Sequence, residues 1–231
     1  LSTHFQEIIR SHCADLLARQ DVQQIVEQVK ESDPAVVKDV VPNLISLPTL
    51  HRVLQGLLRE RVPVRDRVTI LETLGDLAGQ NIGIETLVEQ VRIALAPAFV
   101  RNMEDQNGKL PVLALDPALE SRLVQSLVQT DKGPQLILTP LQVPRLLKAL
   151  EDQHRVYTKS RKNVALICSA SLRPHIRRLL ERAMPKTSVL SYLEIPKGCQ
   201  LDIVAQIPLA AIGDERPGIF SAAATSAKAE G

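Results

Sequence analysis

The side chains in this sequence that could bind a metal or activate a nucleophile are its histidines and cysteines. They are His4, His12, His51, His154 and His175, and Cys13, Cys168 and Cys199. A zinc site needs such ligands at helical or hairpin spacing, as in HxxxH or CxxC, and neither pattern occurs. His4 and His12 are two helical turns apart, but no third ligand lies near them. We therefore expect solvent-facing or hydrogen-bonded histidines and no metal site.

Cys168 is the best-placed candidate nucleophile, because it lies between an expected strand and an expected helix, where a helix dipole can activate a thiol. No histidine base can be assigned to it from the sequence. Gly75, Gly79 and Gly83 lack the spacing of a phosphate-binding loop, and no GK[ST] follows them. The sequence therefore predicts a protein that is not an enzyme and that uses no cofactor.

Composition and charge exclude further classes of function. With 28 Lys and Arg against 26 Asp and Glu, the net charge of +2 creates no general field that selects nucleic acid or anionic lipid. Aromatic residues make up 2% of the chain and Trp is absent, so the stacking surfaces of nucleic-acid binders are not available. No apolar run approaches the roughly 20 residues that span a bilayer. We expect no nucleic-acid partner and no membrane contact by this chain itself.

A cluster of charges surrounds Pro63, where the helical pattern breaks. It consists of Arg59, Glu60, Arg61, Arg65, Asp66 and Arg67. Mixed charges at a helix-to-helix corner usually form a solvated, self-paired turn, in which an exposed pair contributes about 0 to 1 kcal/mol. The alternative is a polar contact with a neighbouring subunit, because guanidinium groups pair directionally with carboxylates. The residues alone favour the solvated turn, and both interpretations stay open.

A second set of charges forms two adjacent stripes on one expected helix. Its members are Arg173, Arg177, Arg178 and Arg182. Such a face could meet acidic protein or nucleic acid. Because Ile176, Leu179 and Leu180 lie opposite, we expect the four arginines to form the water-facing side of an amphipathic helix.

Apolar residues recur at spacings of three and four through residues 1–103, which predicts an all-helical region. Thr3, Asp33 and Ser46 stand where side chains that cap a helix are expected. Pro63 interrupts the pattern, because proline lacks the amide donor that a helix interior needs. Helix is therefore expected to follow helix through this part of the chain.

After residue 103, short apolar runs alternate with helical patterns, which indicates a small α/β region. The expected strands are residues 110–115, 135–138, 164–168, 188–192 and 201–207. Residues 208–231 are small and lack periodicity, so we expect a mobile tail. The predicted fold class is α+β, with a helical subdomain followed by a small α/β subdomain.

Several segments resemble one known family. The run LPTLHRVLQGLLRERVPVRDRVTILETL (residues 47–74) is similar to the signature of the FlhA or FHIPEP family, the large export-gate component of flagellar and virulence type III secretion. Two segments extend the resemblance, THFQEIIRSHCADLLARQDVQQIV (3–26) and SLRPHIRRLLERAMPKTSVLSYLEI (171–195). NGKLPVLALDPALE (107–120) is similar to the flagellar members. The resemblance covers about residues 1–207.

The resemblance implies a longer protein, whose membrane helices and most of whose first two cytoplasmic subdomains lie upstream of Leu1. Residues 1–18 would then be the last helix of the first cytoplasmic subdomain. The helical subdomain would be 19–103, the α/β subdomain 104–207 and a flexible tail 208–231. The implied location is the cytoplasmic domain of a bacterial inner-membrane protein.

The resemblance also implies a function without catalysis. Family members form a ring-shaped platform, expected to be a nonamer, that receives export substrates and chaperone–cargo complexes and works with the ATPase complex. Thr3 matches a threonine of the chaperone-docking region. Arg59, Glu60, Arg61, Arg65 and Asp66 would lie at the subunit interface. A flagellar export gate is the expected function, and the alternative is the equivalent component of a virulence injectisome.

Overall fold

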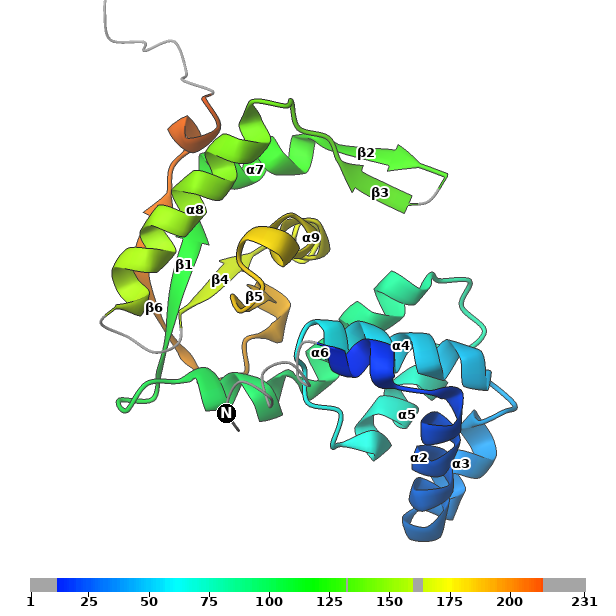
Figure 1. Cartoon of the computed structure of the whole chain (residues 1–231). Helices are drawn as coiled ribbons and strands as arrows, with labels where there is room; N and C mark the ends of the chain where they lie inside the picture. Colours follow the sequence, from blue (N-terminus) through cyan, green and yellow to red (C-terminus); the bar gives the residue numbers. More distant parts are fainter. Residues whose placement is uncertain (1–11, 132, 160–163, 214–231) are drawn as a thin grey trace, which may run out of the picture. The chain divides into compact units, whose positions relative to one another are not determined.

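The chain has the α+β fold that the sequence predicts (Figure 1). The computed structural model describes residues 12–131, 133–159 and 164–213. The chain divides into two compact units. Unit 1 contains the described residues up to Leu110 together with Leu190–Leu201, and unit 2 contains Pro111–Val189 and the described residues from Asp202 onward. The α/β subdomain expected at 104–207 therefore contributes residues 190–201 to the helical unit.

Unit 1 is built from amphipathic helices. They are α2 (Arg19–Ser32), α3 (Pro34–Val40), α4 (Leu47–Arg59), α5 (Arg67–Asp76) and α6 (Ile84–Val100), followed by the short 3-10 helix η1 (Arg101–Met103). Ser46 begins α4 as expected, because its hydroxyl accepts a hydrogen bond from the Thr49 amide at 3.3 Å. Pro34 and Pro48 lie in the first turns of α3 and α4, where a missing amide costs no hydrogen bond.

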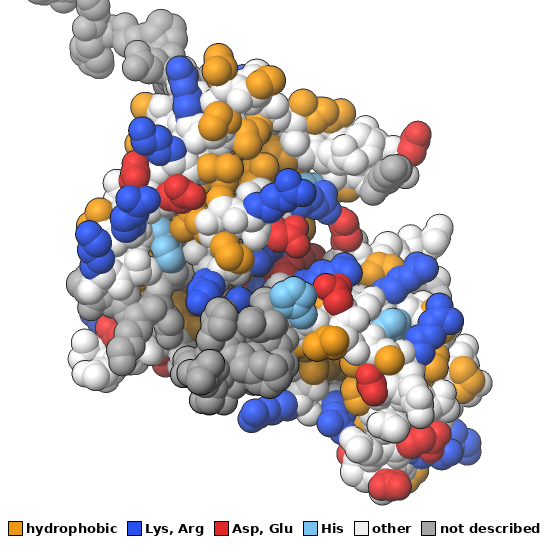
Figure 2. Space-filling view, viewed as in Figure 1, with side chains coloured by type: hydrophobic (Ala, Val, Ile, Leu, Met, Phe, Trp, Pro, Cys, Tyr) orange, Lys and Arg blue, Asp and Glu red, His pale blue; other side chains and the backbone are white. Residues whose placement is uncertain are grey.

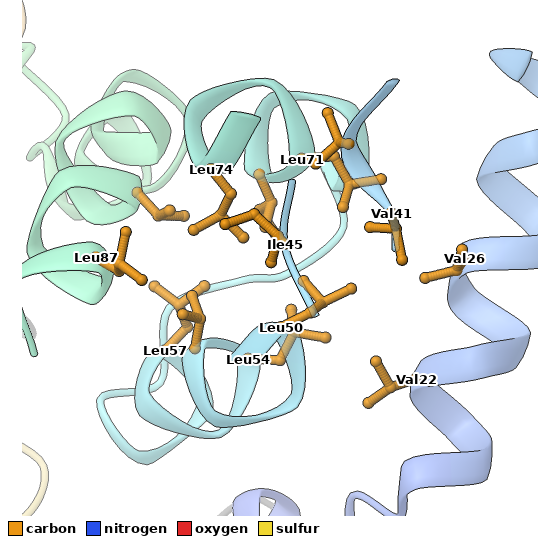
Figure 3. Packing of buried hydrophobic residues seen from close by; sticks show 14 of the residues in the cluster. Val22, Val26, Val41, Ile45, Leu50, Leu54, Leu57, Leu71, Leu74 and Leu87 are labelled. Atoms are coloured by element: carbon orange, nitrogen blue, oxygen red, sulfur yellow. The ribbon is translucent and has the colours of Figure 1, made fainter. Parts of the chain in front are cut away.

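The apolar faces of these helices form the core of unit 1 (Figure 3). Leu50, Leu54 and Leu57 of α4 are each at most 2% exposed, and burial of such a side chain contributes about 1.5 to 3 kcal/mol. Gly56 permits close packing of α4 on α6, because a Cβ there would stand 2.6 Å from a methyl carbon of Val88. The spacing of apolar residues in the sequence thus predicts the face that each helix buries.

A buried cluster of charges lies beside this core, around Arg92 of α6. The Arg92 side chain is 3% exposed and donates to Glu194 at 2.7 Å and to Glu60 at 3.1 Å. The ring of Phe99 lies 5.5 Å from the guanidinium carbon, within cation–π range. Glu194 belongs to the 3-10 helix η2 (Tyr192–Glu194). Arg92 therefore joins three segments of unit 1 that are far apart in the sequence.

Unit 2 is built on a four-stranded sheet with strand order β5-β4-β1-β6 (Figure 1). The strands are β1 (Lys109–Leu115), β4 (Ala165–Cys168), β5 (Val189–Ser191) and β6 (Gln200–Ile207). β1 and β4 run parallel, with Val112 opposite Ala165. Both are buried along nearly their whole length, which explains their continuous rather than alternating apolar sequence.

Three helices complete unit 2: α7 (Pro117–Gln125), α8 (Gln142–Thr158) and α9 (Arg173–Ala183). Asp116 caps α7 by accepting a hydrogen bond from the Ala118 amide at 2.8 Å. Thr139 and Gln142 exchange side-chain to amide hydrogen bonds of 3.3 and 3.0 Å at the start of α8. Asp116 thus serves as a helix cap, and Thr139 orders the turn that leads into α8.

One expected strand has a different position and a different partner. Residues 135–138 were expected to form a strand of the main α/β pattern, but β3 spans Gly133–Leu136. It pairs antiparallel with β2 (Leu127–Thr130) in a separate two-stranded sheet. β2 was not predicted, because its four residues, LVQT, are too few to show a clear alternation of apolar and polar side chains.

The mobile tail was expected to begin at residue 208, but regular structure continues beyond that residue. The 3-10 helix η3 (Leu209–Ile212) follows β6, and Ile212 is 2% exposed in the core of unit 2. The expectation of a mobile tail from residue 208 is therefore wrong for residues 209–212, and residues 214–231 lie outside the described part. Within the described ranges, no helix combines the length and the apolar character needed to cross a bilayer.

Replacing Arg92 by Met is expected to lower the free energy of unfolding by about 3 to 5 kcal/mol, because the fully buried Glu194 carboxylate loses its counter-charge. Urea denaturation followed by circular dichroism measures the loss. Adding Glu194→Gln should recover part of it. The control is Arg59→Met, which breaks only an exposed 3.9 Å pair with Asp15 and should cost at most about 1 kcal/mol. Equal losses in the two single variants would contradict the assignment.

Candidate functional site

The charged cluster occupies the corner between α4 and α5, and α4 ends there in a Schellman motif. The Val62 amide donates to the Leu57 carbonyl and the Arg61 amide to the Leu58 carbonyl, both at 3.0 Å. Arg61 has φ of 60°, the left-handed conformation that glycine usually supplies in this motif. The helix therefore ends just before Pro63, as the sequence predicts, and the Schellman motif completes its end.

The two carboxylates of this corner are used inside unit 1. Glu60 accepts a hydrogen bond from the buried Arg92. Asp66 caps α5, because its side chain accepts from the Thr69 amide at 3.1 Å and from the Thr69 hydroxyl at 2.8 Å. Asp66 remains exposed while it caps the helix, so its place at the expected subunit interface stays a prediction. Both acidic residues of the candidate interface have structural partners.

Three arginines of this cluster are exposed, as is Asp66. Arg59, Arg61 and Arg65, which we call the arginine corner, all have solvent-exposed side chains. Arg59 makes only the long pair with Asp15, and the Arg65 side chain makes no hydrogen bond or ion pair with any described residue. Figure 2 shows positive and negative side chains mixed over the visible face of the molecule. The corner thus presents a local excess of positive charge on a chain of nearly balanced charge.

The second set of arginines does not form the water-facing stripe that the sequence predicts. Arg173 is fully buried, with a guanidinium nitrogen 3.5 Å from the Val189 carbonyl. Arg177 is half-buried and donates to the Thr187 and Pro185 carbonyls at 3.1 and 3.3 Å. Arg173 thus binds the backbone at the start of β5 and Arg177 binds the loop before it, which explains their burial. Arg178 and Arg182 remain exposed.

A cleft of about 420 Å³ lies in unit 2 between the carboxyl-terminal ends of α8 and α9. His154 lines it and hydrogen-bonds Thr187 at 3.2 Å. Burial lowers the pKa of His154, although a hydrogen bond to the Val164 backbone acts in the opposite direction. The neutral imidazole is therefore the form that the folded chain favours, and His154 serves here as a link between α8 and the loop before β5.

The candidate cysteines lie in surroundings that do not favour reaction. Cys168 is fully buried on β4, so a substrate cannot reach its thiol. Burial, with the nearby Glu104 carboxylate, raises the pKa of Cys199, which makes it a weaker nucleophile. Among the described residues, no group of three or more His, Cys, Asp or Glu side chains could hold a metal ion. Thr3, the expected chaperone-docking residue, lies outside the described residues.

The sequence matches the FHIPEP family over residues 1–200. The chain belongs to the FHIPEP family. This confirms the resemblance seen in residues 47–74, a segment that includes the arginine corner. Arg92 was missed by the sequence analysis, although one signal was available: it lies between Val91 and Leu95 on a helix whose buried face is otherwise apolar.

Several named proteins resemble the chain in sequence or in fold. The flagellar biosynthesis protein FlhA of Caulobacter vibrioides is 32% identical over 207 residues, which are 90% of this chain and 30% of FlhA. The structure of Chlamydia pneumoniae CdsV has a TM-score of 0.80 and 27% identity over 89% of this chain and 59% of that chain. Nonameric SctV-C from EPEC has a TM-score of 0.78 and 21% identity, covering 88% of this chain and 61% of that chain. This chain thus spans about a third of the length of FlhA.

Replacing Arg61 by Gly is expected to raise the free energy of unfolding by about 0.5 to 1 kcal/mol, because glycine adopts the left-handed conformation without a clash at Cβ. Thermal denaturation measures the change. Arg61→Ala is the matched control, since it removes the same guanidinium but keeps Cβ in the strained position. If Ala stabilises as much as Gly, the arginine side chain rather than the backbone conformation is the source of the cost.

The stability of the chain is expected to fall as the pH drops below about 6.5, the ordinary pKa of histidine, because the unfolded chain then binds a proton that folded His154 resists. Above that pH the contribution is fully present. Urea denaturation at a series of pH values measures the slope, and His154→Gln should reduce it. His12→Gln, at an exposed position, is the control. An unchanged slope in His154→Gln would assign the pH dependence to other groups.

Proposed function

We propose that this chain is part of the cytoplasmic docking and ring-forming platform of the flagellar type III protein export gate. In this role it receives export substrates and chaperone–cargo complexes and works with the ATPase complex and other export components. The observation that carries the proposal is the FHIPEP match over residues 1–200, which extends through both units. The expected location is the cytoplasmic side of a bacterial inner membrane, with the spanning helices in another part of the full protein.

The flagellar assignment is favoured over a virulence injectisome by sequence similarity. A protein named for flagellar biosynthesis, FlhA of Caulobacter vibrioides, is 32% identical over 90% of this chain. The segment 107–120, which resembles flagellar members, includes β1 and the Asp116 cap of α7. A virulence-type gate would share the fold and remains the alternative.

We also propose that the chain acts by binding and not by catalysis. Two polar residues that follow expected strands have structural partners: Asp116 caps α7, and Thr139 accepts a hydrogen bond from the Gln142 amide at the start of α8. Cys168 is buried. The candidate residues that remain exposed are the charged ones of the arginine corner. Charged surfaces suit reversible contacts with other proteins.

In the full protein, the arginine corner would contribute to contacts between neighbouring subunits of a ring. The structure of EPEC SctV-C is described as nonameric, and the same arrangement is proposed for this protein. The corner is suited to this role, because a Schellman motif holds Arg61 on a short, defined loop and less entropy is lost on pairing. Exposed pairs are screened beyond roughly 8 Å at physiological salt. The isolated chain should therefore be largely monomeric, and tethering at the membrane would raise its effective concentration.

Replacing Arg65 by Glu in the full-length protein is expected to reduce swimming and the secretion of filament protein, because it reverses an exposed charge that has no partner among the described residues of unit 1. The melting temperature of the isolated chain should stay within about 2 °C of the unmodified value. Motility assays and immunoblots of the culture medium give the first readout, and calorimetry gives the second.

Two matched variants make this test specific. Lys148→Glu reverses an exposed charge on α8 and should leave export unchanged. Asp66→Ala removes the cap of α5 and should cost about 1 kcal/mol of stability. If Arg65→Glu instead unfolds the chain, the corner is an internal brace. If it exports normally, the arginine corner has no role in the platform.

A further inference from the structure

The hairpin β2–β3 is a two-stranded sheet that pairs with no other described strand. Its register places Leu127 opposite Leu136, Val128 opposite Gln135, Gln129 opposite Pro134 and Thr130 opposite Gly133. Leu127 and Leu136 pack on the core of unit 2 and anchor the hairpin. Beyond this anchor, Val128, Gln129, Pro134 and Gln135 are all exposed. The outer part of the hairpin is therefore exposed on both faces.

The register also determines which backbone groups point away from the partner strand. In an antiparallel pair, opposite residues alternate between pairs that exchange hydrogen bonds and pairs that do not. The Ile137 amide donates to the Ser126 carbonyl at 2.9 Å, so that pair is hydrogen-bonded. Alternation makes Val128 and Gln135 the next hydrogen-bonded pair. The amide and carbonyl groups of Leu127 and Gln129 must then point to the outer edge of β2.

The two outer edges of the hairpin differ. Pro134 occupies an outward position on β3 and has no amide, so it blocks that edge in the way that natural proteins protect exposed strands. β2 carries no proline, and the opposite residue Gln129 keeps its outward amide. Val128, at 46% exposed, and Ile137, at 56%, place apolar side chains on the same open face. Of the two strands of the hairpin, β2 is therefore the one that keeps its outward amides and carries an exposed apolar side chain, Val128.

We propose that the open edge of β2 binds an extended segment of an export substrate by strand addition. The inference rests on the proposed function and names a contact by which this chain would hold cargo. Main-chain groups at Leu127 and Gln129 would bind the peptide backbone, and Val128 would contact an alternate apolar side chain. This recognition is largely independent of sequence, as a platform for many substrates requires.

The length of the edge favours an extended peptide in transit over a second copy of this chain. Four residues of strand span only about 13 Å, and pairing along them buries far less than the roughly 1,200 Å² of a stable interface. Such an edge suits weak, reversible binding. A permanent dimer through β2 would lack the area it needs.

The test compares Gln129→Pro with Gln129→Thr in the whole chain. Proline removes the outward amide but no hydrogen bond of the hairpin, because residue 129 lies in a pair that does not exchange them. Threonine keeps the amide and favours strands. The probe is a set of overlapping peptides of about twelve residues that covers flagellin from the same bacterium, and binding is measured by fluorescence anisotropy and by hydrogen exchange.

At least one flagellin peptide should bind the unmodified chain and slow exchange of the Leu127 and Gln129 amides. Gln129→Pro should weaken it by about tenfold or more, and Gln129→Thr by no more than about twofold. Unchanged protection of the Val128 and Thr130 amides shows that the proline variant keeps its hairpin. Should that hairpin be lost, Val128→Lys, which keeps every amide, is the second variant and should also weaken binding about tenfold.

Equal binding by the proline and threonine variants would overturn the proposal, as would protection elsewhere or no binding by any peptide. Dimerisation that Gln129→Pro abolishes would also overturn it, because the occupant would then be a second copy. A separate measurement, capture of a chaperone–cargo complex by the full-length protein, tests the proposed function. If capture succeeds equally with Gln129→Pro, the strand-addition inference fails while the docking function stands.

Discussion

Arg92 and its two carboxylates are the interaction on which the arrangement of unit 1 depends. A guanidinium that is 3% exposed has lost nearly all of its hydration, and pairing with Glu194 and Glu60 offsets that cost. The Ser191 amide and hydroxyl bind the second oxygen of Glu194 at 2.7 and 3.0 Å, so this carboxylate is also satisfied. Because each charged group needs the others to offset its lost hydration, the cluster holds α6, the end of α4 and the segment 190–201 in a defined arrangement.

The pairing of Glu60 with Arg92 also affects the charge of the surface at the corner between α4 and α5. Glu60 turns inward to Arg92, and Asp66 is used to begin α5. A sequence with both signs of charge thus becomes a surface on which Arg59, Arg61 and Arg65 are exposed. Arg61 occupies a backbone conformation that costs an L-residue roughly 1 to 2 kcal/mol. Strain of this kind is often found at functional sites, which is consistent with a role for the corner in protein contacts.

In unit 2, two arginines bind backbone carbonyls instead of remaining exposed, and one strand edge stays open. Its α9 arginines at 173 and 177 donate to the carbonyls of Val189, at the start of β5, and Thr187, in the loop before it. They stabilise the connection to β5 and leave less positive charge on the surface than the sequence suggests. Its hairpin leaves one strand edge open while proline closes the other. The surfaces available to partners are therefore defined by which polar groups the fold has already satisfied.

The sequence by itself determined the family, the fold class and most helices, because apolar spacing, caps and prolines act locally. Local patterns of this kind predict the helix caps Ser46 and Asp116 and the strands β1 and β4. Only the tertiary structure decided three other features: the inward turn of Glu60 and Arg173, the inclusion of residues 190–201 in unit 1, and the pairing of β2 with β3. The physical reason is that a charged side chain goes where a distant partner can replace its hydration, and no local pattern encodes the position of that partner.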